Sequence, residues 1–188
     1  MNIFMLDRSP RVAAIYHVDK HVVKMILETA QLLSTAHRVL DGKEVIEQKY
    51  VEGSAPAKYR NIKRWKLDDP DLDQKLYKAT HVNHPSAIWC RSGLDQYRWT
   101  YDLMFHLMLE YNYRYKKTHK CDELLDPLWN APKNIDVEAP WTEATPAMPD
   151  DCKVEGDSVA SYRNYYIQHK SRMAKWTNRA IPRWYKYA

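Results

Sequence analysis

Five polar side chains recur at helical spacing near the start of the chain, in a stretch that is otherwise apolar. The residues from Pro10 to Leu40 are predicted to form one helix of roughly eight turns, with Ser9 as its N-cap and Gly42 as its stop. A rotation of about 100° per residue places the five within a stripe roughly 80° wide. They are His17, His21, Lys24, Glu28 and Gln31. A carboxylate flanked by histidine and lysine is a usual arrangement for acid–base chemistry. The stripe is therefore predicted to be the floor of an active site; the alternative is that these groups only pair with one another beneath a loop.

The apolar remainder of this stretch indicates where the stripe must lie. Nearly every other residue from Val18 to Leu33 is apolar, whereas a surface helix has a narrow apolar stripe and a broad polar face. We therefore expect the helix to be packed on most sides, with Val22, Ile26 and Leu33 buried. The polar stripe should then line a cleft.

Length and composition favour a mainly helical globular protein. The chain has 188 residues, enough for one well-buried domain, and we expect residues 1–188 to form a single domain. Only 4 Gly stand against 14 Tyr and 7 Trp, which suits helices with an aromatic-rich core. The short apolar segment at residues 2–6 is predicted to be an arm laid across that core. A net charge of +5 permits an anionic partner.

Composition and motifs also exclude several classes of protein. The three cysteines are far apart and form no CxxC motif, so we expect free thiols in a reducing compartment. No apolar run approaches the roughly 20 residues of a membrane span, and a cytoplasmic protein is expected, in the host cytoplasm if it is viral. No phosphate-binding glycine loop, GxSxG elbow or GxGxxG fingerprint is present, which leaves nucleotide cofactors and serine-hydrolase chemistry without support.

Two further helices are predicted from periodicity. One begins at Pro85 and carries an aromatic and methionine stripe from Tyr97 to Tyr115, which should face the core. His106 and Glu110 lie four residues apart on another face of it, but a metal site needs more ligands, and no metal is expected there or at the first histidine pair. The last helix should begin at Asp157 or Ser158 and run to about Trp176. Between these helices, the proline-rich connector 121–156 should be anchored by two tryptophans, Trp129 and Trp141.

Basic residues interleave with aromatics in two places. From Lys58 to Lys66 the pattern can bind a nucleic-acid backbone and stack bases, or it is a solvated loop with a tryptophan anchor. The second place is the basic side of the last helix and the tail, where structural docking is the alternative to nucleic-acid contact. Its candidate substrate-binding residues are Lys170, Arg172, Lys175, Arg179, Arg183, Trp184, Tyr185 and Lys186.

Taken together, these segments resemble the phage pyrimidine-dimer DNA glycosylases, the endonuclease V family. The arm MNIF leads into a helix with His21, Glu28 and Gln31. HVNHPSAIW, leading into the aromatic helix and EYNYRY, looks like the family's second helix, and MPDDCKVEGDSVASYRNYY looks like the entrance to its last helix. The tail PRWYKYA looks like its closing segment. Residues 43–80 and 121–147 have no counterpart, and Leu27 stands where the family tends to place Arg.

The resemblance implies a compact all-α bundle without metal or cofactor that flips nucleotides out of duplex DNA and cuts the glycosidic bond. The family's nucleophile is the N-terminal α-amine, assisted by a carboxylate that corresponds to Glu28. Here that amine belongs to Met1, or to Asn2 if the methionine is removed, and asparagine is a poor residue for that removal. His21 and Lys24 would hold phosphates beside Glu28.

Three functions follow as hypotheses. The first is a DNA glycosylase with AP-lyase activity on a damaged or modified pyrimidine in double-stranded DNA, acting as a monomer. The second is a DNA-binding or base-modifying relative that keeps the cleft without excision. The third is a non-enzymatic helical protein that binds a partner, for which a buried Glu28 would have no use.

Overall fold

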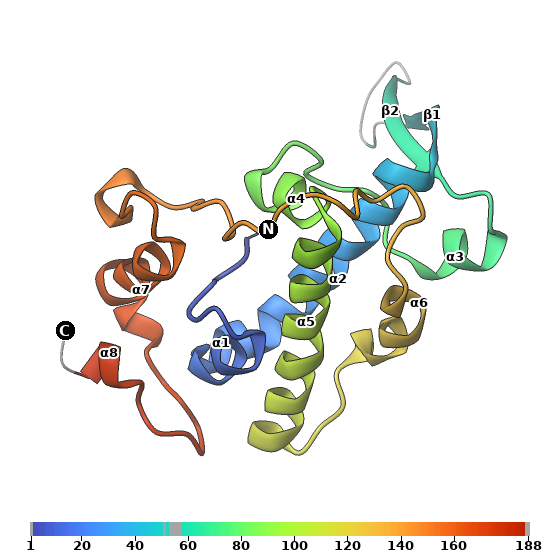
Figure 1. Ribbon diagram of the computed structural model, residues 1–188. Coiled ribbons are helices and arrows are strands. Elements are labelled where there is room, and N and C mark those ends of the chain that lie inside the picture. Colours follow the sequence, from blue (N-terminus) through green and yellow to red (C-terminus); the bar gives the residue numbers. More distant parts are fainter. Residues whose placement is uncertain (1, 51, 53–57, 187–188) are drawn as a thin grey trace.

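The computed structural model describes residues 2–50, 52 and 58–186 and is mainly helical (Figure 1). Helices α2 and α5 cross at its centre, and α1 also packs on α5. Short 3-10 turns lie at 120–124, 150–152 and 171–173. The other elements, in chain order, are α1 (Pro10–Tyr16), α2 (Asp19–Asp41), β1 (Lys43–Tyr50), β2 (Tyr59–Lys66), α3 (Pro70–Lys75), α4 (Pro85–Cys90), α5 (Leu94–Tyr115), α6 (Leu125–Trp129), α7 (Ser158–His169) and α8 (Arg183–Lys186).

The prediction of one helix from Pro10 to Leu40 is wrong, because the chain breaks after Tyr16. His17 and Val18 have extended backbone angles and separate α1 from α2. The cause is tertiary: the backbone N–H of Asp19 donates to the carbonyl of Lys175 (2.8 Å), a contact that a continuous helix could not make. Serine at position 9 and glycine at position 42 cap the two outer ends, as predicted.

The core forms around α2 and the N-terminal arm. Val22, Ile26 and Leu33 are fully buried, which confirms the predicted enclosure of this helix. Ile3 and Met5 of the arm are fully buried as well, so the arm lies across the core and does not pair as a strand. The three cysteines are free, as predicted, and all three are buried.

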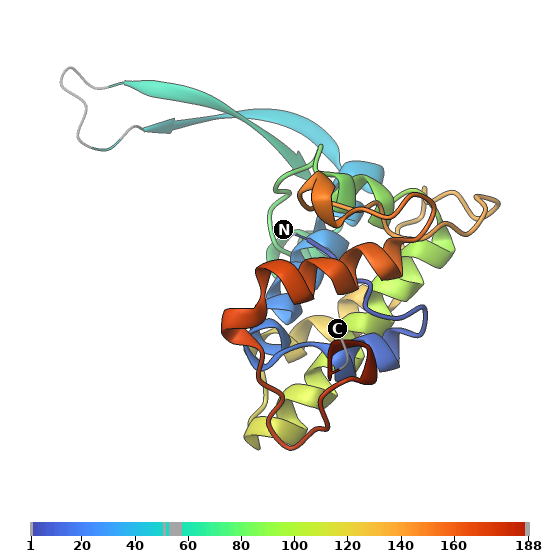
Figure 2. The same cartoon turned by 90° about the vertical axis from the view of Figure 1, so that its left-hand side faces the viewer.

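The expectation of an all-α fold is wrong at residues 43–66. β1 and β2 form an antiparallel hairpin, with pairs that run from Lys43↔Lys66 to Tyr50↔Tyr59. Figure 2 shows the hairpin leaving the helical body as a long ribbon. Most of its residues are exposed on both faces, so its sequence lacks the apolar alternation that identifies a half-buried strand.

Two other boundaries differ from prediction. The helix expected from Pro85 is broken at 91–93, because a Cβ at Gly93 would press against the side chain of Ala139. The last helix starts after the Asp157 cap, as expected, but ends at His169 and not near Trp176. Beyond α7, the indole of Trp176 donates to the carbonyl of Tyr16 at the end of α1.

The two tryptophans of the connector are not buried anchors. Trp129 is 69% exposed and Trp141 is 40% exposed. Their rings instead make edge contacts with Tyr101 and Trp89, respectively, at the surface. The predicted aromatic stripe of α5 does face the core, since Tyr97, Tyr101 and Met104 are buried.

Among the described residues, no helix is long and apolar enough to cross a membrane.

Candidate functional site

The N-terminal arm meets α2 at Glu28. The backbone nitrogen of Asn2 donates to Glu28 Oε2 over 2.9 Å. Lys24, one turn earlier on α2, brings its ammonium within 3.0 Å of the other carboxylate oxygen, Oε1. Both oxygens of Glu28 are therefore occupied by nitrogen donors, while the residue as a whole is 8% exposed.

The side chain of Asn2 holds the arm in this position. Its Oδ1 accepts hydrogen bonds from Ser86 Oγ of α4 (3.3 Å) and from the hydroxyl of Tyr162 of α7 (3.1 Å). Its Nδ2 donates to the carbonyl of Ala147 (2.9 Å). One residue thus joins the arm to three distant parts of the chain. Because these contacts fix the side chain, the Asn2 nitrogen is directed at Glu28.

Met1 lies outside the described residues, so the predicted role of its amine stays a prediction. In a chain from which Met1 has been removed, the nitrogen of Asn2 would itself be the α-amine. That nitrogen already lies within hydrogen-bond distance of the predicted carboxylate. Sequence reasoning identified both groups but missed Ser86 and Tyr162, which position them.

His84, another residue that the sequence reading did not select, lies near the same carboxylate. It caps α4, and its Nδ1 accepts from the backbone N–H of Ser86 (3.2 Å). Burial lowers the pKa of His84, and the charge of Glu28 partly opposes this. The signal that could have found it is the HVNHP segment, whose proline marks a helix start directly after a histidine.

The other residues of the predicted polar stripe differ in their exposure to solvent. Lys24 is exposed and Gln31 is half-buried, so both can reach a ligand. His17 and His21 are buried in the core, which contradicts their predicted place in a cleft. The break between α1 and α2 rotates His17 off the stripe, and Phe4 of the arm stacks on the His21 ring at 4.5 Å.

Burial keeps these two histidines neutral, although the bond of His17 to a backbone carbonyl opposes this for that ring. His17 Nδ1 lies 2.6 Å from the carbonyl of Ala13, and His21 Nδ1 lies 2.6 Å from the hydroxyl of Tyr166. Burial lowers the pKa of His17 to about 4. Burial, followed by the charges of neighbouring cations, lowers the pKa of His21 to about 3. Neither ring is charged near neutral pH, so the predicted phosphate contact of His21 has no support.

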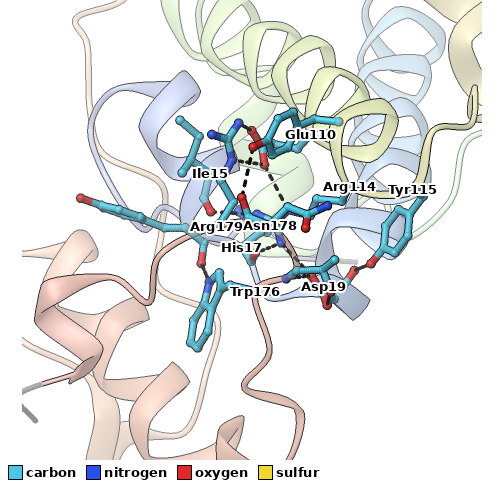
Figure 3. Close-up of polar contacts among 12 residues, drawn as sticks. Ile15, His17, Asp19, Glu110, Arg114, Tyr115, Trp176, Asn178 and Arg179 are labelled. Atoms are coloured by element: carbon cyan, nitrogen blue, oxygen red, sulfur yellow. Dashed lines mark hydrogen bonds and ion pairs between the residues drawn. The ribbon is translucent and has the colours of Figure 1, made fainter.

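A buried ion-pair network fixes the C-terminal segment to the core (Figure 3). Glu110 of α5 pairs with Arg114 (3.1 Å) and with Arg179, and both arginines approach its Oε2. Arg114 also pairs with Asp19 at the start of α2 (3.0 Å), and Asp19 accepts from the backbone and hydroxyl of Thr177. We therefore correct the assignment of Arg179: its guanidinium binds Glu110, and it also stacks over a tyrosine ring of α5.

The other residues of the predicted basic surface differ in exposure. Arg172, Lys175, Arg183 and Lys186 are exposed, whereas Lys170 is half-buried and its ammonium lies over the ring of Tyr165. The two aromatic residues of the tail are docked. Trp184 packs against Tyr16 and Tyr166, and Tyr185 packs against Trp176. For these two aromatic residues, the alternative of structural docking is correct.

Among the described residues, Asp151, Cys152 and His169 bring three possible metal ligands within 4.8 Å of one another. Burial raises the pKa of the Cys152 thiol, and the charge of Asp151 raises it further. A metal binds the thiolate, and structural zinc takes four such protein ligands. The cluster therefore satisfies only part of what a metal requires. Glu110, considered earlier with His106, is occupied by two arginines.

Comparison of the chain with protein-family models, with curated proteins and with solved structures finds no match to any of them.

Proposed function

We propose that the protein is a DNA glycosylase with associated AP-lyase activity, acting as a monomer on a damaged or modified pyrimidine in duplex DNA. The observation that carries the proposal is the 2.9 Å contact between the Asn2 nitrogen and Glu28. Removal of Met1 would make this nitrogen an amine, and an amine beside a carboxylate is the pair of groups that Schiff-base excision requires. The cytoplasm, where such an enzyme meets DNA, is its expected location.

The proposed reaction begins after Met1 has been removed. The neutral amine of Asn2 attacks C1′ of a flipped nucleotide, the new N–C1′ bond forms, and the glycosidic bond breaks as the base leaves with a proton. The resulting amine adduct opens the sugar ring to an iminium ion. Loss of a C2′ proton then allows elimination of the 3′ phosphate. Glu28 stabilises the positive charge that develops at C1′ and carries protons, and Lys24 keeps the carboxylate oriented.

The proposed nucleophile is the unprotonated form of the α-amine. An unperturbed α-amine has a pKa of about 7.7–8.0, so a fair fraction is unprotonated near pH 7.5. The reaction needs no metal or nucleotide, because the nucleophile and the proton carrier both belong to the chain. Val23 and Leu27 lie exposed on α2 beside Lys24, where they offer apolar surface to a displaced base.

Substitution of Glu28 tests the proposal. Glu28→Gln keeps the shape and removes the charge, so excision should fall by roughly 10²-fold or more, while affinity for damaged duplex changes little. The assay is incision of ultraviolet-irradiated and abasic duplexes by wild type, Glu28→Gln and the exposed control Glu155→Gln. If Glu28→Gln cuts as well as wild type does, the assignment of the site is wrong.

Covalent trapping tests the amine separately. Borohydride should link wild type to an abasic duplex, and an N-terminal extension should abolish the link. Intact mass gives the state of Met1 in the same preparation. If Met1 is retained, the Asn2 nitrogen is an amide and cannot attack. Retention together with no trapping would favour the alternative, a DNA-binding or base-modifying relative in which Glu28 only holds the arm.

A further inference from the structure

The hairpin of β1 and β2 projects from the helical body as a two-stranded ribbon (Figure 2). Its eight-residue strands rise by about 3.3 Å per residue, which gives the ribbon a length of about 25 Å. A two-stranded hairpin is only marginally stable by itself in water. A ribbon of this length without a covering element is suited to contact another molecule.

The root of the ribbon is fixed to the helix that carries Glu28. β1 begins directly after Gly42, the C-cap of α2. A Cβ at Gly42 would collide with the carbonyl oxygen of Arg38, so this close approach requires glycine. The guanidinium of Arg38 is fully buried and donates to the carbonyl of Trp65 in β2 (2.9 Å). The direction of the ribbon is therefore set by α2.

The two faces of the ribbon differ in charge. Residues paired across an antiparallel ladder share a face, and successive residues alternate between faces. On one face, named here the basic face, a single carboxylate, Glu47, lies within 4 Å of both Arg64 and Lys66. The charged residues of the basic face are Lys43, Glu47, Lys49, Arg60, Arg64 and Lys66.

The excess of positive charge is clearest at the outer end. Lys49 and Arg60 are register partners, and like charges directly opposite one another destabilise a ladder. They border a recess of about 250 Å³ together with Tyr50 and Glu52, so the described residues that line it hold two cations and one carboxylate. An anion bound between Lys49 and Arg60 would relieve their repulsion.

We propose that the basic face of the ribbon binds duplex DNA, lying in the major groove with its cations on the flanking phosphates. The major groove, about 12 Å wide, admits a two-stranded ribbon. The duplex offers one phosphate charge per roughly 1.7 Å of axis, so every cation along the ribbon has a phosphate within reach. Charge complementarity and ribbon geometry therefore favour the same partner.

The position of this contact relative to the reacting nucleotide rests on the proposed function, whereas DNA binding by the ribbon does not. Glu28 and the end of α2 at Asp41 are 13 residues apart, or about 20 Å at 1.5 Å per residue. That separation corresponds to about six base pairs. The ribbon would hold the duplex on one side of the displaced nucleotide.

The salt dependence of binding tests the ribbon without requiring catalysis. Affinity for an undamaged 30-base-pair duplex is measured by fluorescence anisotropy between 50 and 300 mM KCl. The proteins are wild type, Lys49→Gln/Arg60→Gln and the matched control Lys117→Gln/Lys120→Gln, which changes two exposed lysines near the far end of α5. Each phosphate contact contributes about 0.9 to the slope of log affinity against log salt, so the ribbon variant should lose about 1.8 and the control none.

The outcomes separate the two proposals. A salt slope that is reduced in the ribbon variant alone supports DNA binding by the ribbon. This holds even if wild type cuts no substrate and the glycosylase proposal fails. If the slope is unchanged in the ribbon variant while wild type does cut, DNA binding by the ribbon is overturned and the glycosylase proposal remains. No binding of duplex by wild type overturns both. An A-form RNA duplex gives a further check, because its deep, narrow major groove does not admit the ribbon; an equal loss on RNA would overturn the groove placement.

Discussion

His17 and His21 make the stability of the protein depend on pH. Both side chains are buried, and burial lowers the pKa of His17 to about 4 and of His21 to about 3. In the unfolded chain each has an ordinary pKa near 6.5. Below that pH, the two histidines bind protons in the unfolded state but not in the folded state. The free energy of unfolding should therefore have its full value above pH 6.5. It should decrease as the pH falls toward 4, by up to about 1.4 kcal/mol per pH unit for each histidine.

Urea unfolding at pH 7.5, 6.0 and 5.0 measures this dependence. His21→Phe should make it shallower by up to about 1.4 kcal/mol per pH unit, whereas His81→Asn, at an exposed histidine, should leave it unchanged. A wild-type free energy of unfolding that is equal at pH 7.5 and 5.0 would contradict the neutral, buried state of these rings.

At this scale, the sequence identified Glu28 but not its surroundings. Glu28, Lys24 and Gln31 were found because they lie on one unbroken helix, where spacing determines direction. His17 and His21 fit the same spacing, yet the first lies in the break between α1 and α2 and the second beneath Phe4. Neither effect is encoded in local periodicity. The contacts of Asn2 with Ser86 and Tyr162 span 84 and 160 residues, a range at which no spacing rule applies.

At the scale of elements, the buried charges of α5 attach the C-terminal segment, residues 174–179, to the core. Glu110 is 4% exposed and neutralises both Arg114 and Arg179. Glu110→Ala leaves the Arg114 guanidinium buried without this partner, and removal of one member of a buried pair typically lowers the free energy of unfolding by about 3–5 kcal/mol. Arg179→Gln should cost less, because the Arg179 side chain is 30% exposed and its pairing with Glu110 is partly screened by water.

Urea unfolding and hydrogen exchange test this role together. Amides at residues 174–179 should exchange faster in Glu110→Ala than in wild type, ahead of those in α2, because the segment loses its attachment. Glu110→Ala could instead lower the free energy of unfolding by less than about 1 kcal/mol, outside the range expected for a buried pair, and leave the exchange unchanged. That result would show that Trp176 and Thr177 hold the segment without Glu110. The bond from the Trp176 indole to the Tyr16 carbonyl (2.8 Å) is the competing attachment.

Elements were predictable where local signals agree with tertiary contacts. The caps at Ser9, Gly42 and Asp157 were read correctly, because capping is a local interaction. The ribbon was missed because solvent reaches both of its faces. Its strands are specified by cross-strand pairs such as Lys63 with Glu44, which become visible only once the register is known.

Over the whole molecule, two basic surfaces lie apart: Figure 1 shows α7 on one side of the helical body and the ribbon on the other. In the view of Figure 2, the C-terminal end of α7 lies to the left of the body, as the ribbon does. Arg172 and Lys175 follow that end and are exposed. Glu28 lies on α2, which is continuous with the root of the ribbon.

The combined variant tests whether one duplex meets both surfaces. Arg172→Gln/Lys175→Gln should lower the salt slope by about 1.8, and the combination with Lys49→Gln/Arg60→Gln by about 3.6, since each displaced counterion adds independently. Arg179→Gln, which loses an ion pair with Glu110, should reduce stability and leave the slope unchanged. The measurement is anisotropy on the 30-base-pair duplex, with urea unfolding of every variant. If Arg172→Gln/Lys175→Gln binds with the wild-type slope while the ribbon variant does not, the duplex contacts the ribbon alone. It must then reach Glu28 along α2.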